Sequence, residues 1–149
     1  MRSERGFTLV ELLVVFAITA LLIGLVPVAF DRMRESAQYR NTLRTMLTDM
    51  RSARYRAVSE GAETRFRVNL DQRTYGVDGQ PAREFPESLQ VRLIVADSEM
   101  ANNREGSIRF LSDGGATGGS VDIVRGSGTG VRLRVDWLSG KVTQEPLSP

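Results

Sequence analysis

The chain has 149 residues, a formal net charge of +2, no cysteine and no histidine. This length suffices for one ordinary domain, and the near-neutral charge gives no general case for nucleic-acid binding. The missing cysteines exclude disulfides and thiolate metal sites, and the missing histidines exclude a Ser-His-Asp triad and remove the commonest metal ligand, so we expect no metal and no cofactor.

The N-terminus combines a short basic leader with an acidic residue at the edge of an apolar stretch. The chain begins MRSERGFTLVE, and the 19 residues from Leu12 to Phe30 carry no charge. A helix of that length can span a bilayer. A glutamate costs about 2.5–3.5 kcal/mol at the centre of such a helix and less near the interface. Membrane anchoring alone therefore does not explain the presence of Glu11.

These residues resemble the N-terminus of type IV pilins and type II secretion pseudopilins. The resemblance implies that a prepilin peptidase cleaves between Gly6 and Phe7 and that the new N-terminus of Phe7 is N-methylated. Glu11 then lies four residues on, one helical turn along the same face. Its carboxylate can offset the new ammonium, or that of a neighbouring subunit, during assembly. Such a pair costs far less in lipid or in a filament core than either lone charge.

Two helix-breaking residues, Gly24 and Pro27, lie within the apolar segment. Proline removes a backbone hydrogen bond and tends to kink a helix. In filaments of the pilins that this chain resembles, a proline near this depth marks the place where the helix melts locally during assembly. The other interpretation is a kink that a membrane helix tolerates. Counting flanking basic residues favours the opposite orientation, but the resemblance implies a single pass through the bacterial inner membrane with the C-terminal part in the periplasm.

The rest of the chain changes from a helical to a strand pattern. Residues 31–60 place apolar side chains at helical spacing, and Gly61 provides a stop. Apolar residues then alternate with polar ones, which predicts strands over 64–70, 74–77, 89–95, 108–110, 121–123 and 131–137. Long loops are expected at 81–87 and 96–106. We predict an α+β fold in which a long N-terminal helix packs on one small antiparallel sheet.

The C-terminal part resembles a more specific group. The segments IRFLSDGGATGG at 108–119 and WLSGKV at 137–142 resemble the C-terminal domain of the GspH/FimT group, which holds the H-type minor pseudopilins and some minor type IV pilins. The pair of aspartates expected near the C-terminus of the calcium-binding major pseudopilin is not found in the sequence. The predicted organisation is a prepilin leader (1–6), a transmembrane and assembly helix (7–30), an amphipathic helix (31–60) and a periplasmic β domain (62–149).

Alternation along the predicted strands directs six arginines to the outward face of the sheet. They are Arg65, Arg67, Arg92, Arg109, Arg132 and Arg134. Asp122 and Asp136 offset them only in part. Three interpretations stay open: a solvated face, a docking face for a pilin-like subunit or secreted protein, and a DNA-binding face, because some FimT-like minor pilins bind DNA during uptake. Few aromatic residues stand among these arginines, which argues against stacking on single strands.

Other patterns carry little chemistry. The glycine-rich stretch 114–119 lacks the lysine and Ser/Thr of a P-loop and predicts a hairpin loop. Ser112 beside Asp113 has no histidine partner for nucleophilic catalysis. Asp97, Glu99 and Glu105 lack the spacing of an EF-hand.

The resemblance implies a minor pseudopilin of a type II secretion system, a non-catalytic subunit near the tip of the periplasmic pseudopilus that helps export folded proteins. Its partners would be other major and minor pseudopilins, the prepilin peptidase, the inner membrane and secreted substrates, and nucleic acid is not expected. The alternatives are a FimT/FimU-like minor type IV pilin in pilus assembly or DNA uptake, and a membrane-anchored periplasmic enzyme.

Overall fold

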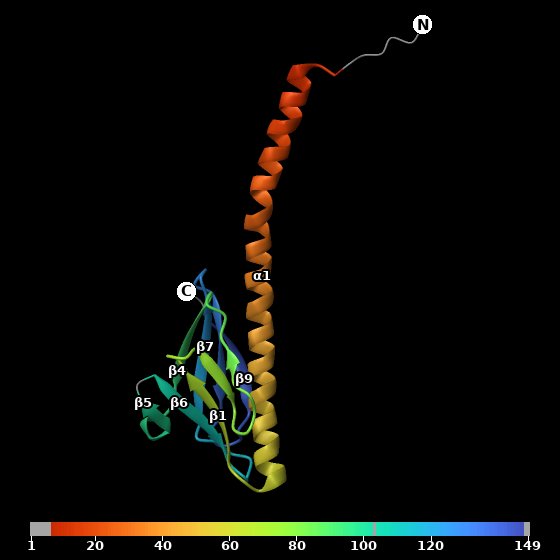
Figure 1. The fold of residues 1–149 in the computed structure, drawn as a ribbon. Helices are drawn as coiled ribbons and strands as arrows, with labels where there is room; N and C mark the ends of the chain where they lie inside the picture. Colours follow the sequence, from red (N-terminus) through yellow and green to blue (C-terminus); the bar gives the residue numbers. More distant parts are fainter. Residues whose placement is uncertain (1–6, 103, 148–149) are drawn as a thin grey trace. The chain divides into compact units, whose positions relative to one another are not determined.

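The structure, a computed structural model, describes residues 7–102 and 104–147, and for residues 25–30 and 32 it describes the backbone alone. Within these residues the chain forms one long helix, α1 (Leu9–Glu60), followed by nine strands and a short 3-10 helix, η1 (Asp97–Glu99) (Figure 1). The chain divides into two compact units, residues 1–37 and residues 38–149.

Both ends of α1 carry capping motifs. At its start the Thr8 hydroxyl accepts a hydrogen bond from the Glu11 amide (3.2 Å), and the Glu11 carboxylate accepts one from the Thr8 amide (3.4 Å). This reciprocal pattern is a capping box. At its end Gly61 has a φ of 65°, and the Ala62 amide donates to the Ala57 carbonyl (3.2 Å), as in a Schellman cap. The expected continuous helix that stops at Gly61 is confirmed.

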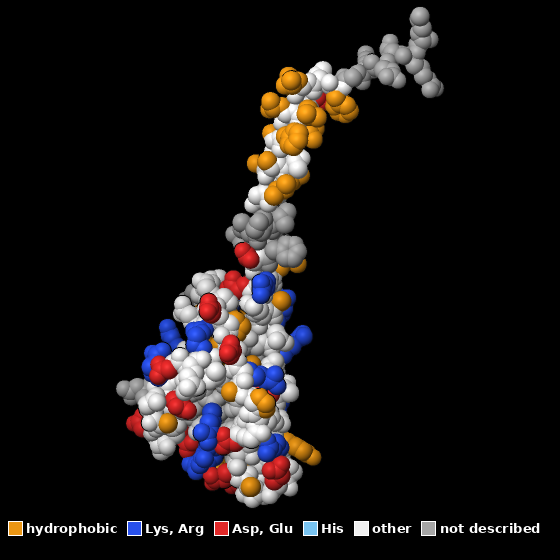
Figure 2. All heavy atoms as spheres, viewed as in Figure 1, with side chains coloured by type: hydrophobic (Ala, Val, Ile, Leu, Met, Phe, Trp, Pro, Cys, Tyr) orange, Lys and Arg blue, Asp and Glu red, His pale blue; other side chains and the backbone are white. Residues whose placement is uncertain are grey.

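The N-terminal unit exposes its large apolar side chains. Phe7 and Leu9 are 79% and 80% exposed, and the apolar side chains as far as Ile23 are at least half exposed or nearly so (Figure 2). In the part of the chain that the structure describes, no helix is both long and apolar enough to cross a membrane. The expected span runs on through 25–30, whose side chains lie outside the described residues.

The strands form two antiparallel sheets. The first sheet has the order β3-β2-β1-β6-β5, and the second has the order β4-β7-β8-β9. The first sheet consists of β1 (Thr64–Asn69), β2 (Thr74–Val77), β3 (Arg83–Glu84), β5 (Met100–Asn102) and β6 (Glu105–Phe110). The second consists of β4 (Leu89–Ile94), β7 (Gly119–Arg125), β8 (Gly130–Val135) and β9 (Val142–Leu147).

One hydrophobic core joins both sheets to the C-terminal part of α1, which runs alongside the strands in Figure 1. Helix residues Met46, Met50, Ala53 and Ala57 are fully buried and recur every three or four positions, so they lie on one face. Alternate residues of the strands complete this core, and the larger ones are Phe66, Ile108, Phe110, Ile123 and Leu133. The buried stripe predicted for the helix is thus the stripe that packs on the sheets.

Several details differ from the sequence-based expectation, although the α+β class is confirmed. The strands form two sheets rather than one. The expected loop 96–106 contains η1, β5 and the start of β6, and the expected loop 81–87 contains β3. Trp137 lies beyond the end of β8 and is 67% exposed. The Asp136 carboxylate accepts hydrogen bonds from the amide and hydroxyl of Ser139 (2.8 and 2.7 Å), so the turn already begins at Asp136.

Candidate functional site

The first candidate site is the start of α1. Gly6 lies outside the described residues, whereas Phe7 is exposed and Glu11 lies in the first helical turn. The capping box with Thr8 adds a role for Glu11 that the sequence-based analysis missed, although the pattern T-x-x-E before an apolar run is a known signal for it. Glu11 is therefore both the expected assembly residue and part of the helix cap.

The cap fixes where the Glu11 charge lies. Its carboxylate is tied to the Thr8 amide, and an anion there is favoured by the unpaired N–H groups at a helix N-terminus. Cleavage after Gly6 would free the amino group of Phe7 and leave the Thr8 amide unchanged. The cap can therefore persist in the cleaved chain, with the carboxylate held one residue from the new ammonium.

The structure says little about Gly24 and Pro27, the two residues at which helix melting or a kink is predicted. Gly24 lies within α1, with open space where a side chain would project. The side chain of Pro27 lies outside the described residues. Local melting or kinking at these positions stays a prediction.

The six predicted arginines do not lie on a single sheet as expected, and whether they bind a partner or DNA stays a prediction. Three belong to the first sheet and three to the second, because the strands that carry them divide between two sheets. In the first sheet are Arg65 and Arg67 on β1 and Arg109 on β6. In the second are Arg92 on β4 and Arg132 and Arg134 on β8.

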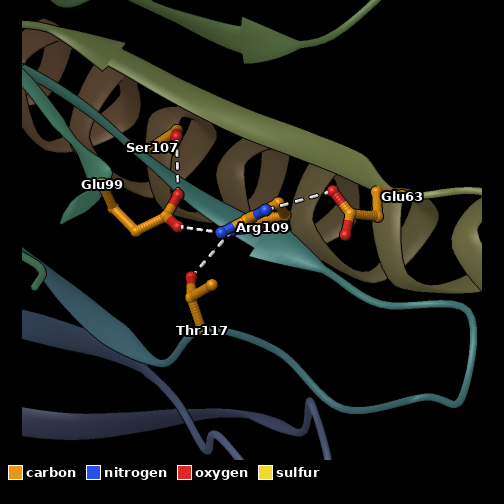
Figure 3. Close-up of polar contacts among 5 residues, drawn as sticks. All are labelled: Glu63, Glu99, Ser107, Arg109 and Thr117. Atoms are coloured by element: carbon orange, nitrogen blue, oxygen red, sulfur yellow. Dashed lines mark hydrogen bonds and ion pairs between the residues drawn. The ribbon is translucent and has the colours of Figure 1, made fainter.

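In the first sheet, Arg109 is the centre of a polar network (Figure 3). Its guanidinium donates to Glu99 (2.6 Å) and to Glu63 (3.2 Å). Glu99 also accepts from the Ser107 hydroxyl (3.2 Å), and its side chain is only 5% exposed. The hydrogen bonds to Glu99 and then Glu63 raise the pKa of Arg109 above its ordinary value. Arg65 lies directly opposite Arg109 across β1 and β6.

In the second sheet, charges of alternating sign form a row across all four strands. Arg92, Asp122, Arg132 and Glu145 are successive cross-strand neighbours. Arg132 binds Asp122 through two hydrogen bonds (2.7 and 2.8 Å), which raise the pKa of Arg132. The Asp122 side chain is 7% exposed, and Arg134 pairs with Glu145 (2.8 Å).

Most of the predicted arginines are thus engaged within the domain. Arg67 pairs with Asp78 (2.6 Å), so four of the six contact a carboxylate. A guanidinium that already binds a carboxylate offers less charge to a phosphate backbone, which binds chiefly through counterion release. Arg132 and Arg134 bridge neighbouring strands, whereas the partners of Arg67 and Arg109 lie outside the strands. The sequence alone could not show these partners.

The acidic and glycine-rich segments considered in the sequence make contacts within the domain. Within residues 7–102 and 104–147, no group of three acidic side chains is placed to hold a metal ion. Glu99, one of the loop acids considered above, binds Arg109 instead. In the glycine-rich stretch, the Gly114 carbonyl accepts a hydrogen bond from Arg54 of α1 (3.2 Å), so this stretch helps attach the loop to the helix.

Two family models match the chain. Residues 1–27 match the prokaryotic N-terminal methylation motif, and residues 42–140 match the type II transport protein GspH. The sequence is 30% identical over 148 residues to the type II secretion system protein H of Xanthomonas campestris pv. campestris, covering 98% of this chain and 86% of that protein.

A solved structure supports the fold. The structure of the minor pseudopilin EpsH from the type 2 secretion system of Vibrio cholerae superimposes with a TM-score of 0.55 and 15% identity, over 75% of this chain and 98% of that one. At this identity the likeness concerns the fold, and it agrees with a helix packed on antiparallel sheets.

Proposed function

The chain belongs to the GspH family of type II transport proteins, and on this premise we propose that it is a minor pseudopilin of a type II secretion system. The observation that carries the proposal is the start of α1, where a methylation-motif match coincides with a glutamate that caps an exposed apolar helix. This arrangement holds one negative charge at the end of an apolar helix, where it can offset the ammonium of a mature pseudopilin subunit.

The proposed maturation follows from the same residues. Prepilin peptidase cuts between Gly6 and Phe7, Phe7 is N-methylated, and residues 7–30 anchor the protein in the inner membrane in a single pass. The β domain then lies in the periplasm. Glu11 offsets the ammonium of its own Phe7 or that of a neighbouring pseudopilin as subunits join.

The proposed role is structural rather than catalytic. The protein joins major and minor pseudopilins near the tip of a pseudopilus, and the growing filament helps move folded proteins out of the periplasm. Support comes from family membership and from the engagement of the polar side chains described above in contacts within the fold.

A pair of variants separates the charge of Glu11 from its capping role. Glu11→Gln keeps a capping-box side chain but removes the charge. Thr8→Ala removes the hydroxyl of the cap, worth about 1 kcal/mol of helix stability, and keeps the charge. We expect Glu11→Gln to abolish secretion of the system's substrates and Thr8→Ala to preserve most of it. If cells that carry Glu11→Gln secrete the substrates at the level of cells with the unmodified protein, the proposed role of Glu11 in assembly is contradicted.

The mass of the protein from its native membrane tests maturation separately. We expect a chain that begins at a methylated Phe7 in the unmodified protein and in Thr8→Ala. A chain that still begins at Met1, or that is cut after the apolar segment, would contradict the pseudopilin proposal. Loss of pili with intact secretion in a deletion strain would instead assign the protein to a type IV pilus machine.

A further inference from the structure

Strand β4, at one edge of the second sheet, has an outer side with unpaired backbone groups. β4 pairs only with β7 among the described strands. The Leu89 amide donates to the Pro86 carbonyl (3.0 Å) and the Leu89 carbonyl accepts from Arg73 (2.9 Å), so both groups face away from β7. Backbone direction alternates along an antiparallel strand. Val91 and Leu93 therefore also direct their N–H and C=O groups outward, where no hydrogen bond from a described residue reaches them.

A groove with an apolar floor lies beside this edge. Its volume is about 460 Å³. It is lined by residues of β4 together with Leu70, which follows β1, and Arg104, which precedes β6. The Leu70 amide donates to the Arg104 carbonyl there (2.8 Å). The apolar lining residues are Leu70, Phe85, Val91, Leu93 and Ile94. An extended chain along β4 would thus find both backbone partners and pockets for alternate side chains.

The charge around the groove has one sign. Its lining includes three arginines, Arg73, Arg92 and Arg104, and no acidic residue. Arg104 pairs with Asp71, whereas neither Arg73 nor Arg92 contacts a carboxylate of a described residue. This differs from the other arginines of the strands, most of which are neutralised by neighbouring acids.

The Arg73 guanidinium is held in place at the end of the open edge. Arg73 has a φ of 53°, the one positive φ of a non-glycine residue in the part of the chain described. Its Nη2 donates to the carbonyls of Pro86 (2.8 Å) and Leu89 (2.9 Å), and its own carbonyl accepts from the Phe85 amide (2.7 Å). A cation fixed in this way loses little side-chain entropy when an anion binds.

We propose that the outer edge of β4 binds an extended segment of another protein, which adds to the second sheet as a further strand and alternates apolar with acidic side chains. The backbone of Val91 and Leu93 pairs with the added strand, the apolar floor takes alternate side chains, and Arg73 and Arg92 attract the acidic ones. The inference holds whichever secretion or pilus machine uses the protein.

A second copy of this chain fits the edge less well than an acidic partner. Two β4 strands paired with each other would bring their Arg92 side chains, and the Arg73 guanidiniums at their ends, onto a shared surface. Like charges near one another across strands are destabilising. The charge of the groove therefore selects an acidic segment.

The test uses the full chain in detergent and a fluorescein-labelled synthetic peptide that matches the 6 residues of β4 in length and alternates valine with aspartate. Binding is followed by fluorescence anisotropy. Matched peptides replace aspartate by asparagine or by lysine. Binding is measured at low salt because salt screens exposed charges. We expect the aspartate peptide to bind at least about fivefold more tightly than the asparagine peptide. The lysine peptide should not bind, because its charges repel the arginines of the groove.

Two pairs of variants locate the site. Val91→Pro removes an outward N–H that makes no bond to β7, and proline is tolerated at such edge positions; Val91→Ala keeps the N–H. Arg92→Gln removes a groove charge, and Arg65→Gln removes an exposed arginine of the first sheet. We expect Val91→Pro to weaken binding at least about tenfold and Arg92→Gln about fivefold. Val91→Ala keeps the N–H but shortens a side chain of the groove, so it should weaken binding clearly less than Val91→Pro does. Arg65→Gln, outside the groove, should bind within about twofold of the unmodified chain.

Several results would overturn the proposal. These are absence of binding by the aspartate peptide, equal binding of the asparagine peptide, and unchanged binding by Val91→Pro or by Arg92→Gln. Self-association that Val91→Pro abolishes would identify a second copy as the occupant and equally reject an acidic partner. If Val91→Pro has lost its fold by circular dichroism, the exposed Arg92→Gln variant and the peptide series still decide the outcome.

Discussion

Arg109 neutralises a carboxylate that has almost no contact with water. Glu99 lies within 2.6 Å of its guanidinium, and removing one partner of a buried pair leaves the other charge uncompensated. We expect Arg109→Met to lower the melting temperature by about 5 °C or more. Arg65→Met, directly opposite on β1, should leave it unchanged or slightly raised because it removes a like charge. Equal losses in the two variants, measured by circular dichroism, would contradict this role.

Asp136 gives the turn after β8 a defined dependence on pH. Hydrogen bonds from the hydroxyl and amide of Ser139 lower the pKa of Asp136 below its ordinary value. Because the pKa in the folded state is below that of the unfolded state, about 3.9, the stabilisation is fully present above that value and is lost as pH falls through the folded pKa. We expect Asp136→Asn to melt below the unmodified protein at pH 7.

The acid limb of the same experiment provides the control. Below its lowered pKa the Asp136 carboxylate becomes protonated, so the difference in melting temperature between the two proteins should shrink as the pH falls. A difference in melting temperature that stays constant from pH 7 to about pH 2 would show that the ionised form of Asp136 does not stabilise the turn.

Helix α1 approaches the sheets through small residues. Ala53 is fully buried, and adding side-chain volume in a packed core costs about 1–3 kcal/mol. We expect Ala53→Leu to lower the free energy of unfolding by that amount in urea titrations. Thr48→Leu adds a leucine on the exposed side of the same helix and should change it by less than about 0.5 kcal/mol. A larger loss for Thr48→Leu would contradict the assigned face.

The sequence predicted the elements that carry a long, regular pattern. The 3.6-residue period and Gly61 located the end of α1, and the alternation around Phe66 and Tyr75 located the first hairpin. Each of these elements repeats its burial pattern over enough residues for periodicity to be read. The α+β class follows from them.

The missed features depend on long-range contacts or are too short for a pattern. β3 and β5 have 2 and 3 residues, fewer than an alternation needs. Alternation also shows which side chains face inward but not which strands pair, so two sheets looked like one. Trp137 continued the apolar alternation of β8, but the hydrogen bonds of Asp136 with Ser139 begin a turn there.

The candidate sites divide in the same way. The capping box at Thr8 and Glu11 is local and could have been read from four residues. The partners of the arginines could not, since Glu99 and Asp122 meet Arg109 and Arg132 only after strand pairing. The groove at β4 likewise joins segments separated in the sequence.

At the scale of the whole molecule, residues 38–149 form a compact unit that contains the buried stripe of α1. We expect a fragment beginning at Gln38 to fold by itself and to unfold cooperatively in urea. A fragment beginning at Ala62 lacks Met46, Met50, Ala53 and Ala57 and should not reach a native near-ultraviolet spectrum. Cooperative folding of the shorter fragment would show that the sheets do not need the helix.

The buried stripe of α1 also determines how the domain resists mechanical load. From Tyr39 to Ala57 the stripe extends about 27 Å along the helix axis, and its side chains lie in one core with both sheets. A force applied along that axis loads these contacts side by side in shear, so they must fail together rather than one after another. We therefore expect the helix to resist a load along its axis better than a load that lifts it from the sheets at one end.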